Sequence, residues 1–161
     1  MNQGSDIQFR LATPDDYDAL GLVMFDAVRN GKSPYSEDQR KAWVAAPRND
    51  SIWHERLRQQ RIIVATANLD IIGFMSIADK GYLDFAYIRP AFQNSGLFRK
   101  LYTRIEQLAV IEKQERLWVH ASLKAQPAFL AMGFQITKTE CVELNGQILE
   151  RFEMEKLLNF L

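Results

Sequence analysis

The segment between residues 82 and 108 constrains the fold more than any other part of this chain. Residues 82–88 are mostly aromatic or β-branched and predict a strand, which ends at Pro90 because proline has no N–H to give to a strand ladder. A short polar loop from Gln93 to Gly96 follows, and apolar residues then recur at helical spacing. A strand that turns tightly into a helix directs several backbone N–H groups, and the positive end of the helix dipole, at one point. The segment therefore predicts a site for an anion such as phosphate.

Composition narrows the class of protein. The chain has 161 residues, enough for one domain with its own core, and we expect a single domain over residues 1–161. Its 20 basic and 20 acidic residues cancel, so its charge indicates neither a nucleic acid nor a membrane as partner. The lone Cys141 excludes an internal disulfide and fits a reducing compartment. With no apolar stretch that could cross a bilayer and no export signal at the N-terminus, the sequence predicts a cytoplasmic protein.

The order of the expected elements predicts an α+β fold. A strand at 7–11 precedes a helix that begins at Thr13-Pro14, and Ser36 and Gln39 form a capping box for a second helix. The later elements are expected in this order: strands at 62–67, 71–77 and 82–88 as an antiparallel meander, a helix at 96–112, a strand at 117–121, a short helix at 125–132, and a hairpin that turns at Asn145-Gly146. We therefore expect a mixed, mostly antiparallel sheet of six to seven strands flanked by about four helices.

This order resembles, from end to end, the GNAT superfamily of acetyl-CoA-dependent N-acetyltransferases. The strand, the x-Pro step, the Gln-x-x-Gly loop and the helix resemble the pyrophosphate loop of that family. A second segment, from Ser122 through Ala125 to Gly133-Phe134, matches the spacing of the family segment after the fifth strand. Residues 35–43, which read Tyr-Ser-x-x-Gln-x-x-x-Trp, resemble a bacterial branch of small GNAT proteins.

The resemblance implies acetyl-CoA as the co-substrate, with no metal. It implies that the pyrophosphate faces the backbone amides of the loop, with Arg99 or Lys100 nearby for charge. It also implies that the pantetheine amides pair with freed backbone groups of the preceding strand, and that two side chains after the fifth strand lie at the cofactor. The implied positions are Tyr87, Ile88 and Arg89 on the strand, Gln93, Asn94, Ser95, Gly96, Leu97 and Phe98 on the loop, and Ser122 and Phe129.

Two positions depart from the family pattern. Phe98 stands where a small residue usually lets the backbone approach phosphate, and Phe129 stands where Tyr often protonates the departing thiolate, which Phe cannot do. These departures leave three hypotheses open. The first is an N-acetyltransferase that acts on a primary amine, by direct transfer in a ternary complex. The second is a non-catalytic acyl-CoA-binding or regulatory module on the same fold, and the third is an interaction domain that does not bind CoA.

The candidate catalytic residues lie on the strand at 82–88. Asp84 interrupts an apolar run, and a carboxylate is costly to bury unless it has a partner or a use. Asp84 is therefore a general base, a surface-facing polar residue or a hydrogen-bonded cap. Tyr82 or Tyr87 is a candidate proton donor. A lone strand histidine such as His120 is more often structural than catalytic.

Three aromatic residues in the helical region, Tyr35, Trp43 and Trp53, are candidates for the wall of an acceptor pocket, although aromatic residues at such spacing more often belong to the core. The expected partner is a small-molecule amine. GNAT domains are frequently dimers, so the resemblance leaves a homodimer open.

Overall fold

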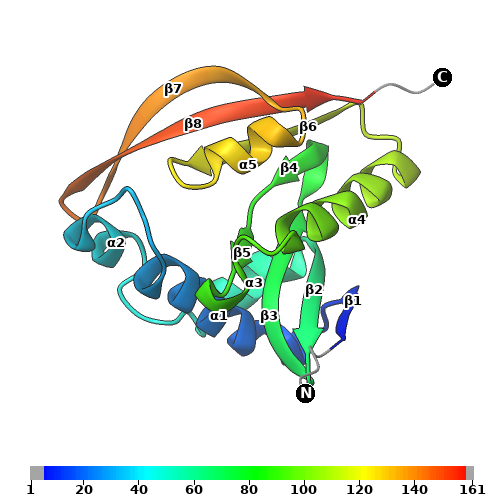
Figure 1. The fold of residues 1–161 in the computed structure, drawn as a ribbon, viewed down its shortest axis with the longest axis horizontal. Helices are drawn as coiled ribbons and strands as arrows, with labels where there is room; N and C mark the ends of the chain where they lie inside the picture. The colour runs from blue at the N-terminus through cyan, green and yellow to red at the C-terminus, as the bar shows by residue number, and fades with distance from the viewer. Residues whose placement is uncertain (1–5, 159–161) are drawn as a thin grey trace.

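The first of two sheets has four antiparallel strands in the order β1-β2-β3-β5 (Figure 1). In this computed structural model, which describes residues 6–158, its strands are β1 (Ile7–Leu11), β2 (Arg61–Ala67), β3 (Asp70–Ile77) and β5 (Ala86–Ile88). Successive side chains of a strand point to opposite faces. Val64 and Phe74 therefore pack on one side of the sheet, and Ile63 and Met75 on the other.

Helices cover both faces of this sheet. On one face lie α1 (Tyr17–Asn30) and α3 (Ser51–Arg58), which bury Leu20, Met24 and Leu57. On the other lies α4 (Leu97–Ile111), which buries Leu101 and Ile105. The shorter helices are α2 (Glu37–Trp43) and α5 (Gln126–Ala131), and 3-10 turns occupy Pro14–Asp16, Asp79–Gly81 and Pro90–Phe92.

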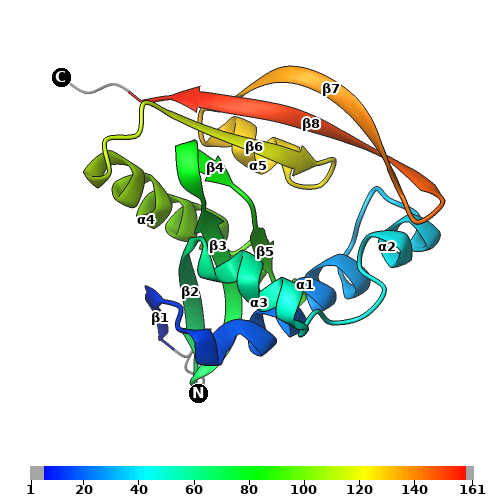
Figure 2. The same ribbon diagram turned by 180° about the vertical axis from the view of Figure 1, so that it is seen from behind.

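The second sheet has the strand order β4-β6-β8-β7. Its strands are β4 (Tyr82–Leu83), β6 (Arg116–Ser122), β7 (Gln135–Leu144) and β8 (Gln147–Leu157). Strand β4 runs parallel to β6, and the other neighbours are antiparallel. The long β7–β8 hairpin arches over α5, as Figures 1 and 2 show from opposite sides.

The tip of this hairpin is attached to α2. The Asn145 side chain donates to the carbonyl oxygen of Ala42 at 2.8 Å, and the Gln39 side chain donates to the carbonyl oxygen of Ile148 at 2.8 Å. The second sheet therefore contacts the helical layer at the tip of the hairpin, away from the β4–β5 junction where the two sheets meet.

The structure confirms the α+β class and the predicted order of elements, but the single strand predicted at 82–88 is wrong. Asp84 and Phe85 lie between two short strands, one in each sheet, so the molecule has two four-stranded sheets instead of one sheet of six to seven strands. The cause is tertiary packing, because Phe85 is buried against Trp53 and Phe74 and its backbone is held by Ser76. Within residues 6–158 there are five α-helices, where about four were expected.

The sequence signals for helix starts and turns agree with the structure more closely than the strand prediction at 82–88 does. The capping box of Ser36 and Gln39 is present, and Asn145-Gly146 turns the hairpin with both residues at positive φ. The helix expected at Thr13 begins as a 3-10 turn and continues as α1. None of the helices in residues 6–158 is long and apolar enough to span a bilayer.

Candidate active site

The break between β4 and β5 opens a gap between the two sheets. Strand β4 pairs with β6 through Tyr82↔Trp118 and Leu83↔Val119, and the pairing ends there. Beyond the break the chain pairs with β3, and Ser76 holds the junction, since its N–H donates to the Phe85 carbonyl oxygen and its Oγ accepts from the Phe85 N–H. Strand β5 and the end of β6 therefore diverge from a common origin.

One edge of β5 faces this gap. Phe85 and Arg89 form backbone hydrogen bonds with β3, and backbone groups alternate in direction along an antiparallel ladder, so those of Ala86 and Ile88 point away from β3. The Ile88 carbonyl oxygen accepts a hydrogen bond from the Gln93 side chain at 2.8 Å. Of the strand positions expected at a pantetheine chain, Ile88 presents its backbone to the gap, whereas Tyr87 and Arg89 turn theirs toward β3.

A cavity of about 600 Å³ lies at this edge. Four parts of the chain enclose it: the end of α1 with the loop that follows, Trp43, β5 with the polar loop, and the β6–α5 junction. Its lining comprises Ala27, Val28, Asn30, Gly31, Lys32, Ser33, Tyr35, Trp43, Ala86, Tyr87, Ile88, Pro90, Gln93, Asn94, Gly96, Phe98, Ser122, Lys124, Ala125 and Ala128. A volume of this order suits a small-molecule ligand.

The polar loop presents backbone to the cavity at the start of α4. Gly96, the residue before the helix, has φ +85°, and a Cβ placed on it would meet no described atom within 4 Å. The first N–H groups of a helix have no acceptor within it, so an anion in this open space would find free donors. Of the loop positions expected at a pyrophosphate, Gln93, Asn94, Gly96 and Phe98 line the cavity.

The remaining predicted loop positions have other environments. Leu97 is buried in the core and can contribute only its backbone. The Ser95 hydroxyl donates to the Phe92 carbonyl oxygen at 2.5 Å, and Arg99 is exposed outside the cavity lining.

The two phenylalanines that depart from the family pattern contact each other. Phe98 packs edge-on against Phe129 with ring centroids 5.1 Å apart, and Phe129 packs in the same way against Phe134. Phe129 is 1% exposed and belongs to the core, so the expected contact of its side chain with a ligand is wrong. Phe98 lines the cavity without filling it.

Lys124 is a cavity residue that the sequence interpretation missed. Its Nζ donates to the Gln93 Oε1 at 2.9 Å, which connects the β6–α5 junction to the polar loop. Burial, followed by the nearby Arg40, lowers the pKa of Lys124, and within residues 6–158 no carboxylate lies within ion-pairing distance of it. A lysine directly before the matched Ala125 was the available signal. Ser122, beside it, lines the cavity and accepts a hydrogen bond from the Ala125 N–H.

Of the three aromatic residues predicted at an acceptor pocket, two line the cavity. Tyr35 and Trp43 are edge-on neighbours, and Trp43 lies near Tyr87. The Tyr35 hydroxyl donates to the Glu150 carbonyl oxygen at 2.5 Å and accepts from the Leu123 N–H at 3.0 Å, and burial raises its pKa.

The third aromatic residue, Trp53, was predicted wrongly. It is 2% exposed, it donates to the Tyr17 carbonyl oxygen at 2.8 Å, and it packs against Phe85 in the core. The Arg89 side chain does not point into the cavity lining either. It donates hydrogen bonds to the Asp26 carboxylate at 2.9 Å and to the Ile71 carbonyl oxygen at 3.0 Å.

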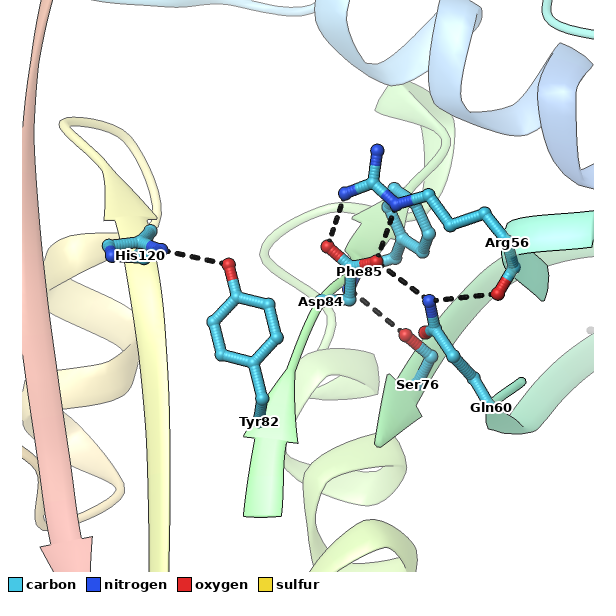
Figure 3. A network of polar contacts seen from close by, with 7 residues as sticks. All are labelled: Arg56, Gln60, Ser76, Tyr82, Asp84, Phe85 and His120. Carbon is cyan, nitrogen blue, oxygen red and sulfur yellow. Dashed lines mark hydrogen bonds and ion pairs between the residues drawn. The ribbon is translucent and has the colours of Figure 1, made fainter. Parts of the chain in front are cut away.

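Asp84, the predicted general base, is held in an ion pair (Figure 3). Its two oxygens accept from Arg56 Nε at 2.8 Å and Arg56 Nη2 at 2.5 Å, and Gln60 donates to it at 2.7 Å. The carboxylate is only 7% exposed, and the hydrogen bond to it raises the pKa of Arg56. Both carboxylate oxygens already accept hydrogen bonds from these donors, so this geometry favours the hydrogen-bonded alternative for Asp84.

Tyr82 points toward His120 in the same view (Figure 3). The Tyr82 hydroxyl lies 2.8 Å from His120 Nδ1. Burial raises the pKa of Tyr82 to about 12 and lowers the pKa of His120, so at neutral pH both are uncharged. Tyr82 and Asp84 lie outside the 600 Å³ cavity and line a second one of about 360 Å³, together with Arg56 and Trp118.

An α+β fold with a central strand split beside a helix N-terminus agrees with the GNAT layout that the sequence resembles, and comparisons with known proteins show the family. The family model for the acetyltransferase (GNAT) domain matches residues 32–158. The uncharacterized N-acetyltransferase YafP of Escherichia coli (strain K12) is 31% identical over 151 residues, which cover 93% of this chain and 95% of that protein. This chain therefore belongs to the GNAT family of N-acetyltransferases.

Solved structures support the same assignment. A GCN5-related N-acetyltransferase from Rhodopseudomonas palustris superposes with a TM-score of 0.88 at 25% identity, covering 98% of this chain and 99% of that one. The PaiA N-acetyltransferase from Thermoplasma acidophilum, solved in complex with coenzyme A, superposes with a TM-score of 0.72 at 19% identity, covering 95% and 99%. The second likeness concerns the fold alone.

Proposed function

We propose that this protein transfers the acetyl group of acetyl-CoA to a primary amine of a small molecule, by direct attack in a ternary complex. The observation that carries the proposal is the cavity of about 600 Å³ that joins the free edge of β5 to the start of α4. A free strand edge suits an extended chain with amide groups, and a helix N-terminus suits a phosphate. The pantetheine arm and the pyrophosphate of acetyl-CoA carry these two features side by side.

The chain's own residues fit such a donor. Backbone groups of Ala86 and Ile88 would pair with the pantetheine amides, in place of the Gln93 side chain that now bonds to Ile88. The open space at Gly96 would admit the pyrophosphate, and Lys124, which has no carboxylate partner within residues 6–158, would supply a positive charge. The bound thioester would supply an activated acyl group.

Most of the rate would come from positioning and from backbone polarisation of the thioester carbonyl. Phe129 has no hydroxyl and lies in the core, so we assign it no role as an acid. Tyr82 is the tyrosine that we assign to proton transfer, because it lies at the origin of the gap and its hydroxyl has a histidine partner. The acceptor would be a small molecule whose amine lies beside Tyr82, because the second cavity is only about 360 Å³ and Tyr82 and Trp118 give it an aromatic wall.

The test is release of free thiol from acetyl-CoA in the presence of a panel of amines: amino acids, a polyamine, an aminoglycoside and a peptide with a free N-terminus. We expect at least one small amine to accelerate thiol release well above the rate with enzyme and acetyl-CoA alone. Binding of acetyl-CoA without amine-dependent release would contradict the proposal and favour a non-catalytic acyl-CoA-binding module. Acceleration by the peptide alone would contradict the small-molecule acceptor.

A further inference from the structure

We propose that His120 receives the proton that the acceptor amine must lose, and that it acts through the hydroxyl of Tyr82. The proposal rests on the function proposed above and assigns a role to a residue that the sequence interpretation set aside as structural. It replaces Asp84, whose carboxylate is occupied by Arg56 and Gln60.

The first support is position. The last paired residues of β4 and β6 are Leu83 and Val119, so the two strands diverge at the next residue of each. Tyr82 and His120 therefore flank the origin of the gap, next to the backbone edge that we assign to the donor. Figure 3 shows the Tyr82 hydroxyl pointing at the imidazole from across this origin, with the Arg56–Asp84 pair on the other side.

The second support is the hydrogen bond itself. The Tyr82 oxygen and His120 Nδ1 are 2.8 Å apart, and the rings meet edge-on at 5.5 Å between centroids. A neutral imidazole accepts at one nitrogen only, and with Nδ1 as the acceptor the Tyr82 hydroxyl is the donor. A hydroxyl that has already given its hydrogen in this way keeps lone pairs free to accept a proton from a third group.

The third support is the set of charges around His120. Glu153 on β8 lies 3.8 Å from Nε2, Arg151 and Glu140 face the ring from β8 and β7, and Asp84 faces it from the β4–β5 junction. Arg151 is paired with Glu140 at 2.6 Å, so its charge is largely balanced. Glu153 is thus the carboxylate placed to stabilise an imidazolium, while burial keeps the imidazole neutral and able to accept.

There is also room for the amine beside Tyr82. The second cavity, of about 360 Å³, is lined by Tyr82 and Trp118, whose rings lie 4.4 Å apart, and by Asp84. An ammonium group there would meet the tyrosine oxygen and the aromatic faces, which attract cations.

The proton and electron balance is complete. The ammonium group gives one proton to the Tyr82 oxygen as Tyr82 gives its own to His120 Nδ1, and the freed lone pair forms the C–N bond. The C–S bond breaks, the thiolate takes the second proton from the acylated nitrogen, and His120 returns its proton to solvent. The sum is one ammonium and one thioester converted to one amide, one thiol and one released proton.

A first measurement does not depend on turnover. The chain has two histidines, so imidazole ¹⁵N resonances can be assigned with the single variant His54→Asn. We expect His120 to be neutral at pH 7 with Nε2 protonated and Nδ1 accepting, to titrate below pH 6.5, and to change its titration in Tyr82→Phe. A charged His120 at pH 7, or one with Nδ1 protonated, would overturn the proposal.

The second measurement is the pH profile of kcat/KM with acetyl-CoA and the fastest amine of the panel. His120→Asn keeps an acceptor for the Tyr82 hydroxyl but no titratable base, so a structural role would survive it. We expect kcat to fall about 100-fold or more, acetyl-CoA affinity to change less than twofold, and the acidic limb of the profile to disappear. Tyr82→Phe should lower kcat by a similar factor. The double variant should have a kcat only slightly below that of the slower single variant, because the two residues act in series.

The matched control is His54→Asn, which removes a histidine paired with Asp18 on the helical side and should leave the profile unchanged. A His120→Asn variant that keeps the acidic limb and a kcat within threefold of the parent would overturn the relay but leave the proposed function standing. A parent protein that releases no thiol with any amine would instead overturn the proposed function, and the relay with it.

Discussion

At the scale of single residues, the partners of two side chains, Asp84 and His120, differ from those that the sequence suggests. Asp84 interrupts an apolar strand and looks like a base, yet Arg56 and Gln60 occupy both of its oxygens. His120 looks structural, yet it lies at the origin of the gap and its Nδ1 is hydrogen-bonded to the Tyr82 hydroxyl. The sequence could not decide this, because the partners of Asp84 lie 24 and 28 residues away in the chain.

Asp84→Asn should therefore act on stability and not on proton transfer. We expect the free energy of unfolding in urea to fall by about 1–2 kcal/mol, since the carboxylate loses charge-assisted hydrogen bonds but Arg56 remains half in solvent. Glu55→Gln, which breaks an exposed pair with Arg58, should change it by less than about 0.5 kcal/mol. Unchanged stability in Asp84→Asn, together with loss of the acidic limb of kcat/KM, would restore Asp84 as the base.

At the scale of elements, the sequence predicts what short-range chemistry determines. The sequence correctly predicts the end of the strand from Pro90, the loop from Gly96 and the helix from the apolar repeat of α4. The Ser36 capping box and the Asn145-Gly146 turn are also present as expected. The break at Asp84 and Phe85 was missed, because it depends on which sheet each half of the strand joins. A strand can be recognised from its own residues, but its partners depend on the whole chain.

Lys124 was missed at the same scale, since its role depends on a loop 31 residues away. Lys124→Gln should weaken acetyl-CoA binding about tenfold in calorimetry and reduce the dependence of that binding on salt, because one cation facing a polyanion is removed. The matched control Lys41→Gln removes an exposed lysine of α2 outside the cavity lining. Equal affinity of both variants, at low salt and at high salt, would exclude Lys124 from the donor site.

At the scale of the whole molecule, two sheets share one interrupted strand and are joined again where the hairpin tip meets α2. Between these two connections lies the cavity, enclosed by segments from both halves of the chain. Composition and element order predicted this fold class, because the order is what the family shares. The number of sheets could not be read from the order alone.

Stability should depend on pH in two stages. Burial lowers the pKa of His120, so the unfolded chain binds a proton there at a higher pH than the folded one, and stability should begin to fall below about pH 6.5. Hydrogen bonds from Arg10 and Arg151 lower the pKa of Asp16 and Glu140, so their contribution is fully present above about pH 4.5 and is lost as the pH falls through the lowered pKa values. Urea unfolding from pH 8 to pH 3 measures both stages. His120→Asn should remove the first stage and Asp16→Asn should reduce the second, and variants that leave the curve unchanged would contradict this assignment.

The central claim is that acetyl-CoA binds across the start of α4, and calorimetry with two glycine variants tests it most directly. Gly96 and Gly146 both have φ +85°, and a Cβ on either would meet no described atom within 4 Å, so Gly96→Glu and Gly146→Glu carry similar backbone strain of about 1–2 kcal/mol. Only Gly96→Glu puts a carboxylate where the pyrophosphate would lie. We predict that the parent and Gly146→Glu bind acetyl-CoA equally and that Gly96→Glu binds it at least about tenfold more weakly. Equal binding by both variants, or no binding by the folded parent, would contradict the account.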